Sequence, residues 1–115
     1  DVRQFFQNVE ARLLSITDFS LYSIGVILTK LKKDDVFKDF LSDTIEDSGV
    51  IRICLDTIDL KQIITVRQKY QLDFDDSYQY VPAEKYNYII VSFDSDFDRT
   101  EHGRKTPKEA LSLLK

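Results

Sequence analysis

The chain has 115 residues with 43% hydrophobic content, which predicts one globular domain over residues 1–115 with a single core. Acidic residues outnumber basic ones 20 to 16, and this balance excludes the broad, charge-driven affinity for nucleic acid that a basic binding protein has. The one cysteine, Cys54, excludes an intramolecular disulfide, and its apolar neighbours predict a buried thiol.

The first half of the chain alternates between helical spacing of apolar residues and short apolar runs. The prediction is helices over residues 2–12, 18–31 and 34–45, with strands over residues 13–17 and 50–54. The helix over 18–31 is apolar nearly all round, which predicts burial on most sides. Thr17 or Asp18 can cap it, and Gly25 predicts the close approach of a neighbour.

The second half continues this pattern. Asp56 can cap a helix over residues 57–69, and a helix over 76–86 contains Pro82, which predicts a kink or two short helices. Residues 88–92 form the clearest predicted strand, and a polar loop follows. A Thr-Pro-Lys-Glu run then begins a helix that is predicted to end near residue 114. Strands that alternate with helices, without a hairpin signal, predict an α/β fold with a parallel sheet flanked by helices.

Two acidic clusters are candidates for chemistry. One precedes the helix over 76–86 and the other follows the strand over 88–92; their members are Asp73, Asp75 and Asp76, and Asp94, Asp96 and Asp98. The helix spans roughly 15 Å in one direction and the strand returns about 16 Å in the other. We therefore expect Asp76 and Asp94 to meet at the carboxyl edge of the sheet, where α/β proteins place their sites.

Carboxylates that are held together favour a bound cation, and hard oxygen ligands suit Mg²⁺ or Mn²⁺. Such an ion can orient water and stabilise charge on a phosphodiester under attack. The alternative is that Asp75 or Asp76 caps a helix, and that Asp94, Asp96 and Asp98 are turn residues or exposed loop. A group of basic residues flanks the second cluster and could contact phosphates or simply be solvated: Arg99, Arg104, Lys105 and Lys108.

These residues resemble the PIN domain family. Leu72-Asp73-Phe74-Asp75-Asp76-Ser77 is similar to its segment in which an aspartate opens a helix, and residues 89–97, Ile-Ile-Val-Ser-Phe-Asp-Ser-Asp-Phe, to its final strand and Thr/Ser-x-Asp-x-Asp-Phe motif. The resemblance implies a three-layer α/β fold in which Asp76, Asp94 and Asp96 bind Mg²⁺ or Mn²⁺. Ser92 matches a hydroxyl that supports the catalytic site.

Two features depart from the family pattern. The first catalytic aspartate of the family, in an Asp-Thr-Asn-like motif on the first strand, has no counterpart here. We therefore expect either that the domain is incomplete at its N-terminus or that another segment takes the place of that strand. The family's usual Glu on the helix after the second strand is also absent, because Ser20-Leu21-Tyr22-Ser23 offers none. The nearest carboxylate is Asp18, and the alternative for this residue is that it is only a helix cap.

The resemblance implies a metal-dependent ribonuclease that hydrolyses RNA. The family includes the VapC-type toxins of toxin–antitoxin pairs, so a protein antitoxin and a homodimer are the partners it implies. The alternative function is a catalytically weakened domain that binds RNA or protein. A lone thiol suits the cytoplasm, and no apolar stretch approaches the ~20 residues that cross a membrane.

Overall fold

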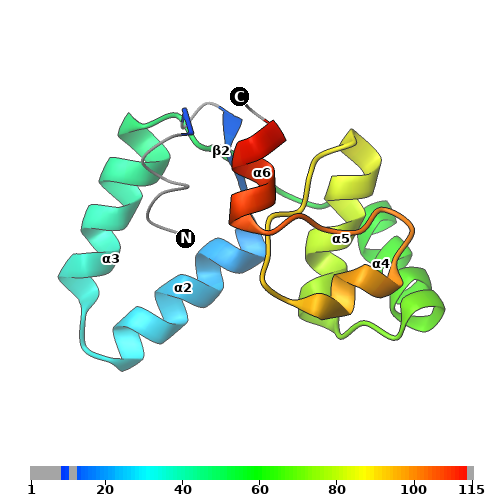
Figure 1. Cartoon of the computed structure of the whole chain (residues 1–115). Helices are drawn as coiled ribbons and strands as arrows, with labels where there is room; N and C mark the ends of the chain where they lie inside the picture. The colour runs from blue at the N-terminus through cyan, green and yellow to red at the C-terminus, as the bar shows by residue number, and fades with distance from the viewer. Residues whose placement is uncertain (1–8, 11–12, 114–115) are drawn as a thin grey trace. The chain divides into compact units, whose positions relative to one another are not determined.

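The computed structural model describes residues 9–10 and 13–113, and these form two compact units. The N-terminal unit is Val9–Cys54 and the C-terminal unit comprises residues 55–113 (Figure 1). The helix predicted over residues 2–12 lies almost wholly outside the described residues, as does residue 114, at the predicted end of the last helix. The fold is α/β: helices dominate, and the paired strands are parallel, as the sequence predicted.

The N-terminal unit is built on a short parallel sheet. Its strands are β1 (Ser15–Thr17) and β2 (Ile51–Ile53), which pair in parallel with Ser15 opposite Ile51 and Thr17 opposite Ile53. Between them the chain forms α2 (Asp18–Lys30), α3 (Asp34–Phe40) and the π-helix η2 (Leu41–Asp47). Parallel strands need a crossover connection of this kind, because a tight turn can join only antiparallel strands.

Local sequence signals set the limits and the packing of α2. The Thr17 hydroxyl accepts the Ser20 N–H at 3.2 Å, so Thr17 rather than Asp18 is the cap. Gly25 lies against α3: a Cβ built at this position would be 2.8 Å from the Phe37 ring. The close approach that the sequence predicted at Gly25 is therefore confirmed, and Phe37 is the neighbour.

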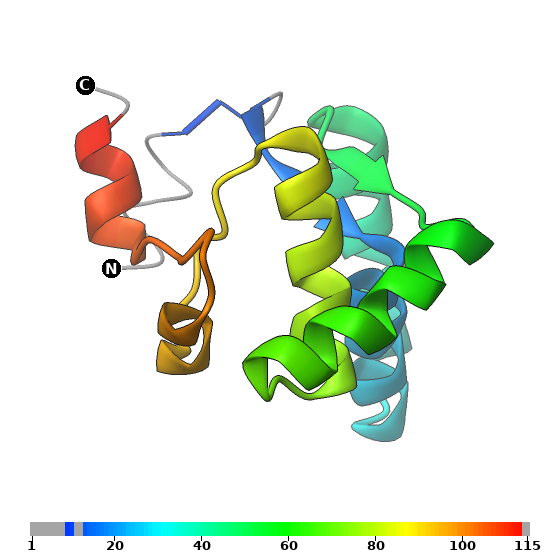
Figure 2. The same cartoon turned by 90° about the vertical axis from the view of Figure 1, so that its right-hand side faces the viewer.

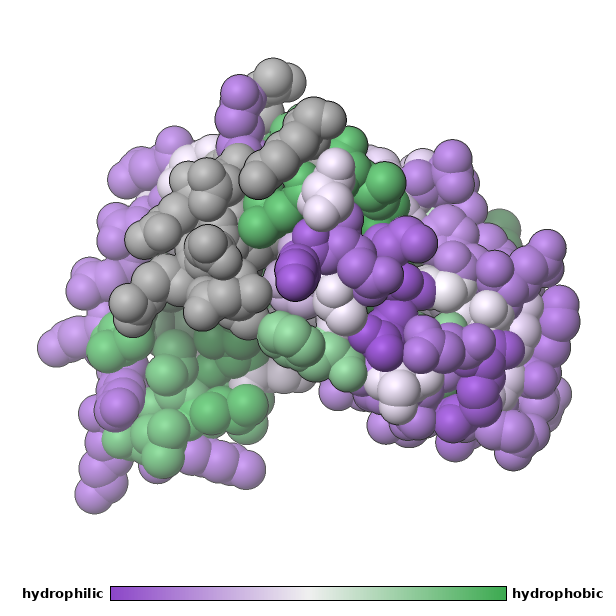
Figure 3. Space-filling model, in the orientation of Figure 1, coloured by the Kyte–Doolittle hydropathy of each residue, from purple (hydrophilic) through white to green (hydrophobic). Residues whose placement is uncertain are grey.

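Burial in the N-terminal unit differs from the prediction. On α2 only Leu21 and Gly25 are buried, while Val26 and Ile27 are exposed, so burial on most sides is wrong. A unit this small encloses few side chains completely. Figure 3 shows hydrophobic residues gathered on the surface over α2 and α3. Cys54 is also exposed, contrary to the predicted buried thiol, because it lies beyond the last residue of β2.

The C-terminal unit contains α4 (Thr57–Tyr70), α5 (Phe74–Tyr86), the 3₁₀ turn η3 (Ser95–Arg99) and α6 (Pro107–Leu113). Helix α4 packs across α5 (Figure 2). The apolar core between and beside them consists of Ile63, Val66, Leu72, Tyr78, Tyr80, Val81, Ala83, Ile90 and Phe97. Because α5 contributes the largest share of this core, its first turn, which carries Asp76, stands on a rigid element.

Helix limits in this unit follow the predicted caps. Asp56 and Asp59 form a reciprocal capping box at the start of α4, and Thr106 and Glu109 exchange the same pair of bonds before α6. Pro82 is buried inside one continuous α5, so the alternative of two short helices is wrong.

The segment predicted as the clearest strand is extended but is not a strand of a sheet. Within the described residues its pairing is a single parallel bridge between Val91 and Lys105. The Lys105 N–H donates to the Ile90 carbonyl at 2.8 Å, and the Ser92 N–H donates to the Lys105 carbonyl at 3.0 Å. A strand requires a paired partner as well as its own β propensity. The composition of residues 88–92 therefore predicted a sheet strand where the structure has only an extended segment with one bridge.

Candidate functional site

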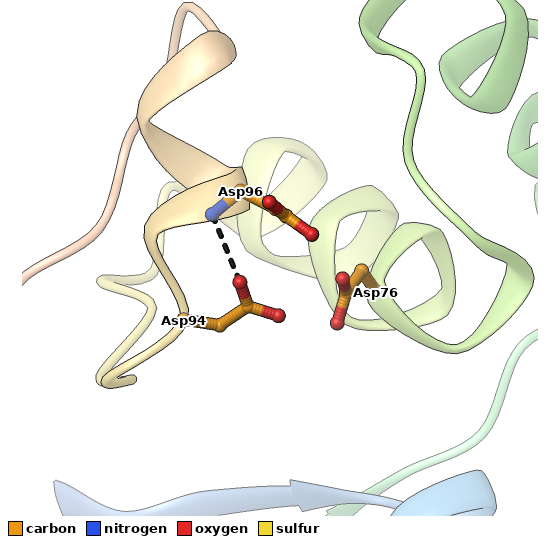
Figure 4. A group of neighbouring side chains, drawn as sticks. All are labelled: Asp76, Asp94 and Asp96. Atoms are coloured by element: carbon orange, nitrogen blue, oxygen red, sulfur yellow. Dashed lines mark hydrogen bonds between the residues drawn. The ribbon is translucent and has the colours of Figure 1, made fainter.

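Three carboxylates meet in the C-terminal unit. One oxygen each from Asp76, Asp94 and Asp96 lies within 4.8 Å of the other two. Figure 4 shows Asp76 on α5 and the other two on the neighbouring turn, with their carboxylates turned toward one another. The structure thus brings together the pair that the opposed helix and extended segment were expected to join. No other group of three His, Cys, Asp or Glu side chains in the described residues is this close.

The capping of α5 explains why the Asp76 carboxylate is not used as the helix cap. Asp73 caps α5, and its carboxylate accepts the Asp76 N–H at 2.8 Å. Asp76 occupies the third helical position, so its backbone N–H bonds the cap, and its carboxylate lies beside those of Asp94 and Asp96. The alternative that Asp76 is itself the cap is therefore wrong.

The turn that follows Ser92 positions the carboxylates of Asp94 and Asp96. The Asp94 carboxylate accepts the Asp96 N–H at 2.9 Å and caps η3, and the Asp94 N–H donates to the Ser92 hydroxyl at 3.0 Å. Ser92 thereby orients the backbone of Asp94. Arg104 supports the same segment: its guanidinium donates to the Ser92 carbonyl and to the Asp98 carboxylate, both at 3.1 Å.

The carboxylates repel one another. Burial, together with the negative charges of Asp73 and Asp94, raises the pKa of Asp76 to about 7, and a hydrogen bond with Asp94 also favours the protonated form. Burial and the Asp73 charge raise the pKa of Asp75 as well. A cation at this position would replace the proton and remove the repulsion.

Arg99 joins the turn to the end of α4, a contact that sequence reasoning missed. Its guanidinium donates to the Asp96 carboxylate at 3.1 Å, to the Tyr70 carbonyl at 3.1 Å and to the Gln71 carbonyl at 2.7 Å. The spacing of Asp96 and Arg99 could have indicated the ion pair, but nothing in the sequence indicates the two carbonyls. Because its nitrogens are engaged in this way, Arg99 fits poorly with a phosphate contact, which was one of the two roles that the sequence left open.

The donor set fits a small divalent cation. Oxygens that share one Mg²⁺ at about 2.1 Å lie about 3 to 4 Å apart, so the present spacing needs only small side-chain rotations. The ligands are hard carboxylate oxygens, with no sulfur or imidazole among the three, which favours Mg²⁺ or Mn²⁺ over softer metals. Asp94 is exposed and the Asp96 side chain is half exposed, so an ion and a polymeric substrate could both reach them.

The family model for the PIN domain matches residues 2–103, which covers most of both units. The chain belongs to the PIN domain family. Members of this family are generally nucleases that use divalent metal ions, so the carboxylate group of this PIN domain lies in a fold that performs metal-dependent cleavage elsewhere. Neither the curated proteins nor the solved structures contain a significant match to the chain.

One feature expected of the family is missing from the N-terminal unit. Ser20 to Ser23, where the family resemblance implied a Glu, lie in the first turns of α2 and carry no carboxylate. The Asp18 carboxylate accepts the N–H of Phe19 at 2.8 Å.

Among the described helices of both units, none is long and apolar enough to cross a membrane.

Proposed function

We propose that this PIN domain is a metal-dependent ribonuclease whose divalent ion, Mg²⁺ or Mn²⁺, is held by Asp76, Asp94 and Asp96. The observation that carries the proposal is the meeting of these three carboxylates, from segments about twenty residues apart, within a domain of a nuclease family. The pKa of Asp76, which burial and the negative charges of Asp73 and Asp94 raise, adds support, because perturbed carboxyl groups are common at functional sites.

Each residue has a distinct task in this proposal. Asp76 provides a ligand from a rigid helix, and Asp94 and Asp96 provide ligands from a turn whose backbone is fixed by Ser92. When bound, the ion supplies positive charge that activates water and stabilises the charge developing on a phosphodiester. Preorganisation of the ligands matters because a site that is an ångström too loose loses much of its rate.

The net charge of the chain agrees with a substrate that is bound through the ion. At a formal charge of −4 the protein repels a polyanion such as RNA in the absence of divalent cations. A bound ion offsets part of this repulsion at the point of cleavage. RNA as the substrate, and the VapC-type toxin role with an antitoxin, a homodimer and a cytoplasmic location, stay predictions from the family resemblance.

A second candidate function is a weakened PIN domain that binds RNA or protein without cleaving. The absence of a Glu between Ser20 and Ser23 favours it, because the family usually places a fourth carboxylate there. The two candidates differ in metal binding and turnover: a cleaving domain needs both, whereas an interaction module needs neither.

Calorimetric titration with Mn²⁺ tests the metal site. Wild-type protein is expected to bind saturably, and Asp94→Asn to lose binding, because the substitution removes one of three charged ligands. Asp98→Asn is the matched control: Asp98 is exposed on the same turn but pairs with Arg104 at 3.1 Å instead of joining the three carboxylates. Equal binding by the two variants, or none by the wild type, contradicts the proposal.

A further inference from the structure

Arg99 bonds both the Asp96 turn and the end of α4, two residues before α5 begins. Its Nη1 donates to the Asp96 Oδ1 atom at 3.1 Å, and its Nε and Nη2 donate to the carbonyls of Tyr70 and Gln71. Those carbonyls lie at the C-terminal end of α4, where Gln71 adopts a left-handed conformation with φ of 57°. The planar fork of an arginine suits three acceptors in fixed directions.

The three bonds have a consequence for the carboxylates. Asp76 lies on α5, which follows Gln71 after only two residues, whereas Asp96 lies on η3. A bridge from η3 to the end of α4 therefore fixes the separation between the two segments that carry the ligands. Buried Phe97 anchors η3 through apolar contact, but an apolar contact has no preferred direction and cannot orient a carboxylate.

The orientation of Asp96 follows from the same contact. Arg99 engages one oxygen of this carboxylate, so the rotation of the side chain is restricted. A carboxylate that bridges an arginine and a metal ion is held on both sides, and such outer contacts of a ligand tune metal affinity.

We propose that Arg99 is a positioning residue for the metal site, which holds Asp96 and the η3 turn in register with Asp76. The inference rests on the proposed function, since it concerns the affinity of that site for its ion. Charge alone predicts the opposite effect: a cation beside a ligand repels a divalent ion, so its removal would tighten binding. The two accounts can therefore be separated by the sign of the change.

The test is Mn²⁺ affinity, measured from the electron paramagnetic resonance signal of free Mn²⁺, in Arg99→Lys and Arg99→Ala. Both variants are expected to bind about three- to tenfold more weakly, because Lys keeps the charge but loses the fork. Arg67→Lys and Arg67→Ala are matched controls on the last turn of α4, outside the three bonds, and are expected to bind within about twofold of wild type.

The outcomes are distinguishable. Wild-type affinity in Arg99→Lys, or tighter binding in Arg99→Ala, overturns the positioning role while leaving the metal site in place. Absence of Mn²⁺ binding by the wild type overturns the proposed function and the positioning role with it. Weakening by the Arg67 variants to the same extent shows an effect that is not specific to the three Arg99 bonds, and it also overturns the inference.

A measurement on the wild-type protein covers the case in which the Arg99 variants do not fold. The Nε–H resonance of Arg99 should be protected from exchange with water and should shift when Mg²⁺ is added, because this group is bonded to the Tyr70 carbonyl and its neighbour to Asp96. The Nε–H of Arg67 provides the unprotected reference. Rapid exchange at Arg99 that Mg²⁺ leaves unchanged overturns the inference.

Discussion

At the scale of single residues, the helix cap decides which aspartate of the candidate site keeps its carboxylate free of the α5 cap. The sequence suggested Asp75 or Asp76 as the cap of this helix, and the structure shows that Asp73 has this role. The Asp76 side chain therefore does not cap α5, and it lies next to other negative charges. Such locally unfavourable residues are expected where function requires them.

The raised pKa of Asp76 leads to a prediction about stability and pH. The carboxyl of Asp76 has a pKa of about 7 in the folded state, against its ordinary value of 3.8, so its ionisation opposes folding. Without divalent ions, the destabilisation is absent near pH 3, grows as the pH rises through this range and is complete above about pH 7. Asp76→Asn removes it, and should stabilise the protein by on the order of 1 kcal/mol at pH 8 after discounting for solvent screening.

Urea unfolding in EDTA checks this prediction at pH 4 and pH 8. The advantage of Asp76→Asn over the wild type should be small at pH 4 and should grow toward pH 8. With Mg²⁺ added, the wild type should gain stability and the variant should gain less, because only the wild type keeps all three ligands. An advantage that is equal at the two pH values would show that ionisation of Asp76 is not its cause.

At the scale of elements, the sequence was informative wherever the signal is local. The caps Asp56 and Thr106 were predicted correctly because a cap depends on residues three positions apart. The extended segment over 88–92 was assigned too much structure, because strand formation depends on a partner distant in sequence. Continuity of α5 through Pro82 likewise depends on tertiary packing around that residue, which local rules do not contain.

Gly25 and Phe37 give a prediction for the packing of α2 on α3. Gly25→Ala should improve helix propensity by about 1 kcal/mol, but its Cβ would lie 2.8 Å from the ring of Phe37. In a Phe37→Leu background the ring is gone, so the same substitution should become clearly stabilising. A double-mutant cycle of unfolding free energies should give a coupling of about 1 kcal/mol. Additive effects would mean that the ring yields at no cost.

At the scale of the whole molecule, the sequence predicted which carboxylates come together but not the bonds of Arg99 beside them. Order along the chain and the lengths of two opposed segments were sufficient to bring Asp76 near Asp94. The bridge from Arg99 to the carbonyls of Tyr70 and Gln71 was not predictable, because it joins groups nearly thirty residues apart and backbone acceptors have no sequence signature. Family membership across residues 2–103 then gives the carboxylates a chemical context.

Cleavage of a labelled RNA by the full natural protein is the measurement that tests the central claim most directly. The expected result is cleavage that requires Mg²⁺ or Mn²⁺, stops in EDTA, and falls by more than about a hundredfold in Asp94→Asn while Asp98→Asn stays near wild type. Cleavage that persists in EDTA, or that is equal in the two variants, would contradict a metal-dependent ribonuclease built on these three carboxylates.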